Sequence, residues 1–240
     1  METKRYGWCG QILKVDLTKN RIEKLDTMRY VNRFIGGRGI ATKIYWDEVY
    51  PEISAFDPEN HLIIMTGPIV ATGVHGAARC TVMGKSPMLL PEGFCYGNVG
   101  SFLGGYIKRA GYDGIIIHGR SNTPVYLLIQ DEKVQILAAA SLWGKGVYEV
   151  GDIFKDKYGK KIRYLTTGVA GENMCRSANL MTENDGSITG GFGAVFGSKK
   201  LKAVAILGTG RPSIAESEQL KDLNRKVHHL IKTPSVPDSN

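Results

Sequence analysis

Three glycine-rich segments precede predicted helices, and they give this sequence its clearest capacity for chemistry. The segments are Gly36-Gly37-Arg38-Gly39, Gly97-Asn98-Val99-Gly100 and Gly190-Gly191-Phe192-Gly193. The first turn of a helix carries unpaired main-chain N–H groups at the positive end of the helix dipole, so it attracts anions. Glycine also lets the main chain approach a bulky ligand closely. Together the segments predict phosphate binding, whereas each alone also fits an ordinary tight turn.

The common nucleotide-binding motifs fit poorly. No Gly-x-x-x-x-Gly-Lys-Ser/Thr loop is present in the sequence. The spacing of Gly191, Gly193 and Gly197 approaches a dinucleotide fingerprint, but it follows a polar loop at 182–189 instead of a strand. A Rossmann enzyme is therefore disfavoured.

The four cysteines form no Cys-x-x-Cys pair. Because such spacing is typical of zinc and iron–sulfur sites, this sequence supplies no recognisable ligand set of that kind. Reduced, buried thiols fit a cytoplasmic protein. The cysteines are Cys9, Cys80, Cys95 and Cys175.

The formal net charge is +8, from 31 basic and 23 acidic residues. This excess favours anionic partners such as a phosphate-bearing cofactor or an acidic redox protein. The basic residues are scattered, and no aromatic–basic module accompanies them, so nucleic-acid binding is disfavoured. No stretch is apolar enough to predict a membrane partner.

Period-two alternation predicts hairpins at 11–25 and 125–137, and short apolar runs predict buried strands at 61–65, 114–117 and 203–207. Helical spacing predicts helices at 29–36, 40–49 (stopped by Pro51), 146–157 and 215–232. A succession of glycine turn, helix, basic residues and strand recurs three times and indicates internal duplication. We therefore expect an α+β fold with mixed sheets.

The character of the chain changes near residue 208, where Gly208-Thr209-Gly210-Arg211-Pro212 resembles a linker. The helix expected at 215–232 is amphipathic and has little sequence after it to pack against. We therefore divide the chain into a domain at 1–207 and a linker with the start of a helical region at 208–240.

Several motifs, in order along the chain, resemble the N-terminal domain of the aldehyde:ferredoxin oxidoreductases. Each motif is rich in glycine or polar residues, and together they extend from residue 6 to about 207. The motifs are Tyr6-Gly7-x-x-Gly10, Gly36-Gly37-Arg38-Gly39, Asp57-Pro58-Glu59-Asn60, Thr66-Gly67-Pro68, Ala78-Arg79-x-x-Val82-x-x-Lys85-Ser86-Pro87, Gly97-Asn98-x-Gly100, Lys108-x-Ala110-Gly111-Tyr112-Asp113, Ala170-Gly171-Glu172-Asn173 and Gly193-Ala194-Val195-x-Gly197-Ser198-Lys199.

The resemblance implies two similar, intertwined α+β halves that form a base for a tungsten or molybdenum bis-pyranopterin cofactor. A Mg²⁺ ion would bridge the two pterin phosphates. It also implies aldehyde oxidation to a carboxylic acid, with electrons passing through a [4Fe–4S] cluster to ferredoxin. Other domains or a separate subunit would hold that cluster, and family enzymes often form homodimers. The chain alone is expected to be inactive.

By position in the family motifs, Asn98 would offer its main-chain carbonyl to Mg²⁺, and Gly97 and Gly100 would lie against a phosphate. Arg79 would lie between the pterin and the cluster. The second magnesium carbonyl would fall at Gly186 or Ser187, beside the glycines Gly190, Gly191 and Gly193. No residue of this chain is expected to be catalytic.

The sequence departs from the family in the loop at 185–189, which lacks the usual arginines, and at His75. Because the sequence lacks the family's cluster ligands, two alternatives stay open. The chain is a stand-alone carrier or assembly subunit for the pterin cofactor, or it belongs to family members that act on aromatic thioesters.

Overall fold

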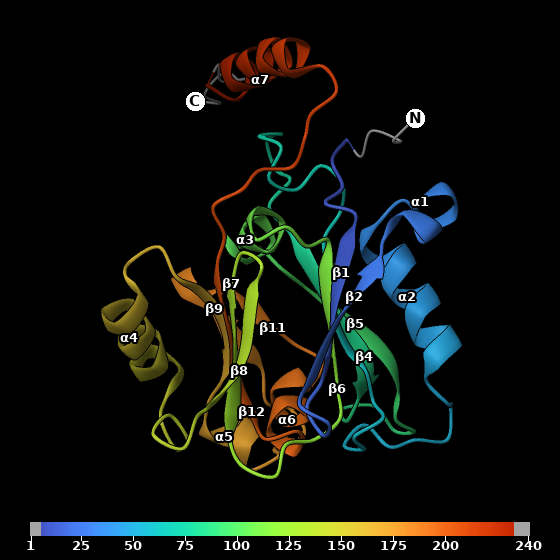
Figure 1. Cartoon of the computed structure of the whole chain (residues 1–240), viewed down its shortest axis with the longest axis vertical. Helices are drawn as coiled ribbons and strands as arrows, with labels where there is room; N and C mark the ends of the chain where they lie inside the picture. The colour runs from blue at the N-terminus through green and yellow to red at the C-terminus, as the bar shows by residue number, and fades with distance from the viewer. Residues whose placement is uncertain (1–5, 233–240) are drawn as a thin grey trace, which may run out of the picture.

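The computed structural model describes residues 6–232, the side chain of Asn184 excepted. Two six-stranded mixed sheets face each other (Figure 1). The first has the order β2-β1-β6-β3-β4-β5. Its strands are β1 Gln11–Asp16, β2 Arg21–Asp26, β3 Leu62–Met65, β4 Cys80–Ser86, β5 Gly93–Val99 and β6 Gly114–His118.

The second sheet repeats this order. Read from its opposite end, it runs β8-β7-β12-β9-β10-β11. Each half begins with a hairpin whose first strand pairs in parallel with the last strand of that half. The strands are β7 Val125–Gln130, β8 Lys133–Ala138, β9 Arg163–Thr167, β10 Leu180–Thr182, β11 Ser187–Ile188 and β12 Leu201–Leu207. The expected α+β fold with mixed sheets is confirmed.

The helices form the outer layers and fill the ends of the space between the sheets (Figure 1). Helices α1 (Met28–Phe34) and α2 (Gly37–Glu48) cover the outer face of the first sheet. Helix α4 (Val147–Tyr158) covers the second. Between the sheets, the main core includes α3 (Leu103–Arg109) and α6 (Phe192–Ser198). The short helices α5 (Val169–Glu172) and η1 (Glu183–Asp185) complete the second half.

The internal duplication is twofold, which corrects the threefold recurrence read from the sequence. Helix α2 corresponds to α4, and α3 corresponds to α6, so each half has two glycine-preceded helices. The segment at 36–39 therefore corresponds to the glycines at 144–146. The segment at 97–100 corresponds to 186–189, because β5 ends at Val99 and β11 at Ile188, and α3 and α6 begin four residues after these strand ends. Each sheet is built by one half alone, so the halves interlock through packed faces instead of shared strands.

Several elements differ from the sequence prediction. Strands β4, β5, β9, β10 and β11 were not predicted from apolar runs. Gly97, Asn98 and Val99 belong to strand β5, so only Gly100 of that segment lies in a turn. The two hairpins, the three apolar strands and the four helices are present, with ends shifted by at most about three residues.

Buried lysines join parts of the chain that are distant in sequence. Lys108 pairs with Asp113, which also accepts hydrogen bonds from the main-chain N–H groups of Cys9 (2.9 Å) and Gly10 (2.8 Å). Lys202 pairs with Glu172. Because a buried charge without a partner is costly, these pairs fix their neighbours in place.

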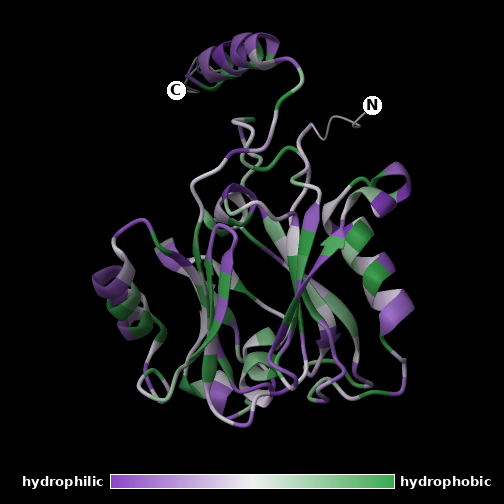
Figure 2. Cartoon of the chain, viewed as in Figure 1, coloured by the Kyte–Doolittle hydropathy of each residue, from purple (hydrophilic) through white to green (hydrophobic). Residues whose placement is uncertain are grey.

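The segment after β12 is held against α3. The N–H of Gly210 donates to the carbonyl of Arg109 (2.8 Å), and Pro212 is buried. Helix α7 (Ser217–Lys232) then stands apart from the sheets and has no buried residue (Figure 1). Figure 2 shows that α7 is mostly hydrophilic, in contrast to the strands between the two outer layers. Two parts of the predicted divisions lie outside the described residues. They are residues 1–5 of the domain at 1–207 and residues 233–240 of the segment at 208–240.

Candidate functional site

The predicted site residues of the two halves meet where the edge strand of each sheet ends. A Cβ placed at Gly97 would lie 2.6 Å from the side chain of Ile188 and 3.1 Å from the carbonyl oxygen of Thr189. A Cβ at Gly186 would lie 2.7 Å from the carbonyl oxygen of Gly100. These close approaches require glycine at 97 and 186. They place the segments 97–100 and 186–189 side by side, and we call this meeting line the seam.

The side of the seam that faces outward carries the polar groups. Asn98, Gly100 and Ser187 are exposed, as is Arg79. Strands β4 and β5 pair Cys80 with Val99, so Arg79, just before β4, and Gly100, just after β5, lie at the same end of this ladder. The seam therefore gathers four of the predicted residues, which come from separate elements.

At the seam, the main chain at Gly100 is more open to a ligand than the main chain at Gly186. A Cβ at Gly100 would meet nothing within 4 Å, so the main chain there faces open space. The carbonyl of Gly186 already accepts hydrogen bonds from the N–H (2.7 Å) and the hydroxyl (3.2 Å) of Thr182. The side chain of Asn98 is held by the Thr81 hydroxyl, which donates to Oδ1 at 2.9 Å. A metal ion that used the Gly186 carbonyl would share it with these donors.

The glycines at 190–193 are buried, which corrects the expectation of an open turn there. Gly190 and Gly191 have φ of 98° and 70°, values that favour glycine. The Gly190 carbonyl accepts a hydrogen bond from the Ser86 hydroxyl (2.8 Å), and the Gly193 N–H donates to Ala178 (2.9 Å). Their glycine character is thus explained by close packing inside the protein. A cofactor contact at Gly190, Gly191 and Gly193 stays a prediction.

A family model for the aldehyde ferredoxin oxidoreductase N-terminal domain matches residues 12–208. This chain belongs to that family. The chain is 37% identical over 233 residues to the tungsten-containing aldehyde ferredoxin oxidoreductase of Pyrococcus abyssi, a match that covers 95% of the chain and 38% of the relative.

Two further proteins are similar to nearly the whole of this chain. The aliphatic sulfonate oxidoreductase WOR-like subunit of Pyrococcus furiosus is 36% identical, over 92% of this chain and 38% of the relative. The active-site complex BamBC of benzoyl coenzyme A reductase, solved with 1,5-dienoyl-CoA, superposes with a TM-score of 0.89 at 36% identity. That match covers 97% of this chain and 37% of the other. The chain thus spans well under half the length of these relatives.

A buried carboxylate that was not predicted from the sequence stabilises the seam. Glu183 accepts hydrogen bonds from the N–H groups of Phe102 (3.1 Å) and Tyr164 (3.3 Å). Burial raises the pKa of its carboxyl group. This acid links the polar loop of the second half to the start of α3. In the sequence, Glu183 is marked only by its place near the start of the polar loop at 182–189.

The exposed face of β5 extends the seam as a row of alternate side chains, Phe94, Tyr96 and Asn98. The guanidinium of Arg38 lies 4.6 Å from the centre of the Tyr96 ring. The glycine turn at 36–39 therefore borders the same row. A groove of about 680 Å³ lies here, between α2 and β5, and includes Arg38, Gly39 and Tyr96. The alternation of residues 94, 96 and 98 was the available signal for this strand face.

Within residues 6–232, no group of three or more His, Cys, Asp and Glu side chains is placed to hold a metal ion. No helix in that range is long and apolar enough to cross a membrane.

Proposed function

We propose that this chain holds a tungsten or molybdenum bis-pyranopterin cofactor within an oxidoreductase that converts aldehydes to carboxylic acids. Family membership supports an oxidoreductase. The observation that carries the cofactor proposal is the seam, where Arg79, Asn98, Gly100 and Ser187 lie exposed together although they belong to different halves. A ligand with two phosphates would require anion-binding groups from both halves.

Each residue at the seam would have a separate task. Arg79 is exposed and would present a planar set of donors to a phosphate or a pterin ring. The open main chain at Gly100 would lie against a phosphate. The carbonyl of Asn98, on the edge strand β5, would meet a Mg²⁺ ion that bridges the phosphates, and Gly186 or Ser187 would provide the opposite contact. When bound, the cofactor would supply the redox chemistry, and this chain would position and neutralise its phosphates.

Substitution of Gly100 by Val tests this role in the complete enzyme. A Cβ at Gly100 meets no protein atom within 4 Å, so the G100V variant should fold with an unchanged melting temperature. Its side chain would occupy the space assigned to a phosphate, so tungsten or molybdenum and pterin content should fall at least about tenfold. Metal content is measured by mass spectrometry and pterin content by fluorescence after oxidation.

Gly105→Ala is the matched control, because a Cβ there also meets nothing within 4 Å but lies on α3, away from the seam. It should retain full cofactor content. Normal cofactor content in G100V would refute the assignment of the seam.

We further propose that other domains, or a separate subunit, carry a [4Fe–4S] cluster that passes electrons to ferredoxin, and that the enzyme is cytoplasmic. The relatives are more than twice as long as this chain, which supports further parts. The purified chain should accordingly contain no stoichiometric tungsten or iron and oxidise no aldehyde. A full cluster in the pure chain would contradict this division of tasks. Pterin retained by the chain without metal would favour the carrier function.

A second candidate is activity on an aromatic thioester. It is favoured by the similarity to the benzoyl coenzyme A reductase complex at 36% identity over 97% of this chain. Assays of the complete enzyme with an aliphatic aldehyde, an aromatic aldehyde and an aromatic acyl thioester distinguish the two. Turnover of the thioester alone would replace aldehyde oxidation as the proposed reaction.

A further inference from the structure

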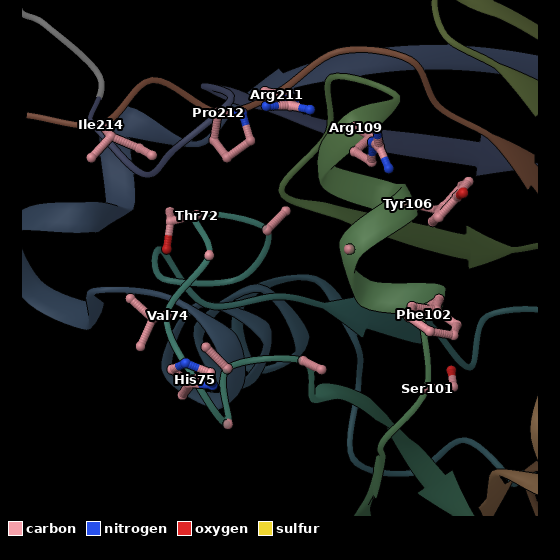
Figure 3. Close-up of a pocket in the computed structure, with 16 residues that line it drawn as sticks. Thr72, Val74, His75, Ser101, Phe102, Tyr106, Arg109, Arg211, Pro212 and Ile214 are labelled. Atoms are coloured by element: carbon pink, nitrogen blue, oxygen red, sulfur yellow. The ribbon is translucent and has the colours of Figure 1, made fainter. Parts of the chain in front are cut away.

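A pocket of about 580 Å³ lies between α3, the loop at 71–78 and the segment after β12. Figure 3 shows its walls, with Phe102 just before α3 and Tyr106 on it, Thr72, Val74 and His75 on the loop, and Pro212 and Ile214 at the far side. Its volume falls in the usual range for small-molecule sites, about 300–1,000 Å³. Ser101 and Ala78 line it, so the pocket begins directly beside Gly100 and Arg79 of the seam.

Two arginines, Arg109 and Arg211, line the end of the pocket where the segment after β12 passes α3 (Figure 3). Neither has a carboxylate partner among residues 6–232. The Nε of Arg109 is buried and has no hydrogen-bond partner in the described chain. A buried donor without a partner is costly, so a ligand that draws this guanidinium toward an acceptor would relieve that cost.

The surroundings leave the positive charge of the arginines uncompensated. No Asp or Glu lines the pocket. Neither Glu183, which accepts from the Phe102 N–H, nor Asp131, which accepts from the N–H (2.8 Å) and hydroxyl (2.9 Å) of Thr209, forms an ion pair with these arginines. The pocket therefore presents two guanidinium groups to whatever enters it.

The pocket is also rigid at this end. The Gly210 N–H donates to the Arg109 carbonyl (2.8 Å), which holds Arg211 next to Arg109. The Tyr106 ring lies 5.3 Å from the Arg109 guanidinium and 4.8 Å from that of Arg163. These two cation–π contacts help to keep the tyrosine in place. A site that is ordered before binding loses less entropy when the ligand enters.

We propose that this pocket binds a small organic oxyanion, a carboxylate or sulfonate attached to a flat apolar body. The anionic head is held by Arg109 and Arg211, because guanidinium groups offer paired donors to planar or tetrahedral oxyanions. The body lies against Phe102, Tyr106 and Pro212. The proposal goes beyond the cofactor function and does not depend on it, since every group named belongs to the described chain.

Calorimetric titration of the full chain at low ionic strength tests the proposal. Benzoate and benzenesulfonate should bind saturably with one site per chain, and the neutral isostere benzamide should bind at least about tenfold more weakly. Arg109→Gln and Arg211→Gln should each weaken benzoate binding about tenfold or more, in line with the loss of a hydrogen bond to a charged group. Arg211 is exposed, so its substitution should leave the fold intact.

Arg21→Gln is the matched control, since it makes the same change of charge on exposed strand β2. It should leave benzoate affinity unchanged. Failure of both anions to bind saturably would overturn the proposal. So would equal binding of benzamide, or an equal loss in the R21Q variant, which would indicate a general effect of net charge. None of these outcomes bears on the cofactor content that tests the seam.

Discussion

Lys199 offers the sharpest test of how the two halves hold together. Its side chain is fully buried, at 0% exposure. Its Nζ lies within hydrogen-bond distance of three main-chain carbonyls, those of Pro58 (3.0 Å), Gly119 (3.3 Å) and Asp57 (3.5 Å). The lysine comes from the second half and two of the carbonyls come from the first. The perturbation is Lys199→Met, which keeps an unbranched side chain one heavy atom shorter and removes the amine.

Burial, helped by the nearby Arg120, lowers the pKa of Lys199 to about 7, and the carboxylates of Glu59, Asp57 and Asp16 act in the opposite direction. The unfolded chain keeps an ordinary lysine pKa near 10.5, so between these two values the unfolded state binds more protons. The free energy of unfolding therefore rises with pH in this window, by at most about 1.4 kcal/mol per pH unit. From pH 7.5 to 9.5 the gain is about 2–3 kcal/mol.

Urea unfolding at several pH values between 7.5 and 9.5 measures this effect. The difference in unfolding free energy between the wild-type chain and the K199M variant should grow with pH by the amount above, because all other titrating groups are shared. Lys200→Met is the control, since the neighbouring lysine donates to Asn122 at the surface. Parallel pH profiles for the wild-type chain and K199M would refute the assignment of a buried, largely neutral Lys199.

Three further predictions concern packing and burial. Gly197→Ala should destabilise the chain by about 2 kcal/mol or more, because its Cβ would collide with the Gly171 carbonyl, whereas Gly105→Ala on the equivalent helix should stabilise it by about 0.5–1 kcal/mol in thermal unfolding. Asp113→Asn should cost about 3–5 kcal/mol in urea by leaving the buried Lys108 without its partner, and the exposed Asp156→Asn should change little. Burial lowers the pKa of His61 to about 3, helped by His118, Lys14 and Lys199, so the chain should lose stability as the pH falls below 6.5; His61→Phe should remove this contribution and move acid unfolding to lower pH.

Much of the fold followed from the sequence because its signals are local. The hairpins alternate strictly, and strands β3, β6 and β12 are short apolar runs. Strands β4 and β5 lack such a signal, since both contain glycine and β5 alternates between exposed aromatic and small residues at the edge of its sheet. Their strand state depends on pairing with each other and with β3, a long-range contact that no local pattern reports.

The seam could be predicted only in part. The family motifs indicated Arg79, Asn98 and Gly100, and these residues are exposed and near one another in the ladder. Glu183, which joins the loop at the seam to α3, carries no motif of its own. The pocket arginines were not predicted either. Arg211 lies close to Arg109 along the main chain because the segment after β12 is hydrogen-bonded to the end of α3, and the sequence does not indicate this path.

The duplication places an exposed residue of each half at the seam. Gly100 and its counterpart Thr189 each lie three residues before a helix and are both exposed, whereas Gly190 and Gly191, which follow Thr189, are buried. The cause of their burial lies outside this segment. Pro87 lies directly against Gly191, and Ser86 donates to Gly190, so the end of β4 in the first half covers the turn in the second. The glycines that follow the seam in the second half therefore join the two halves.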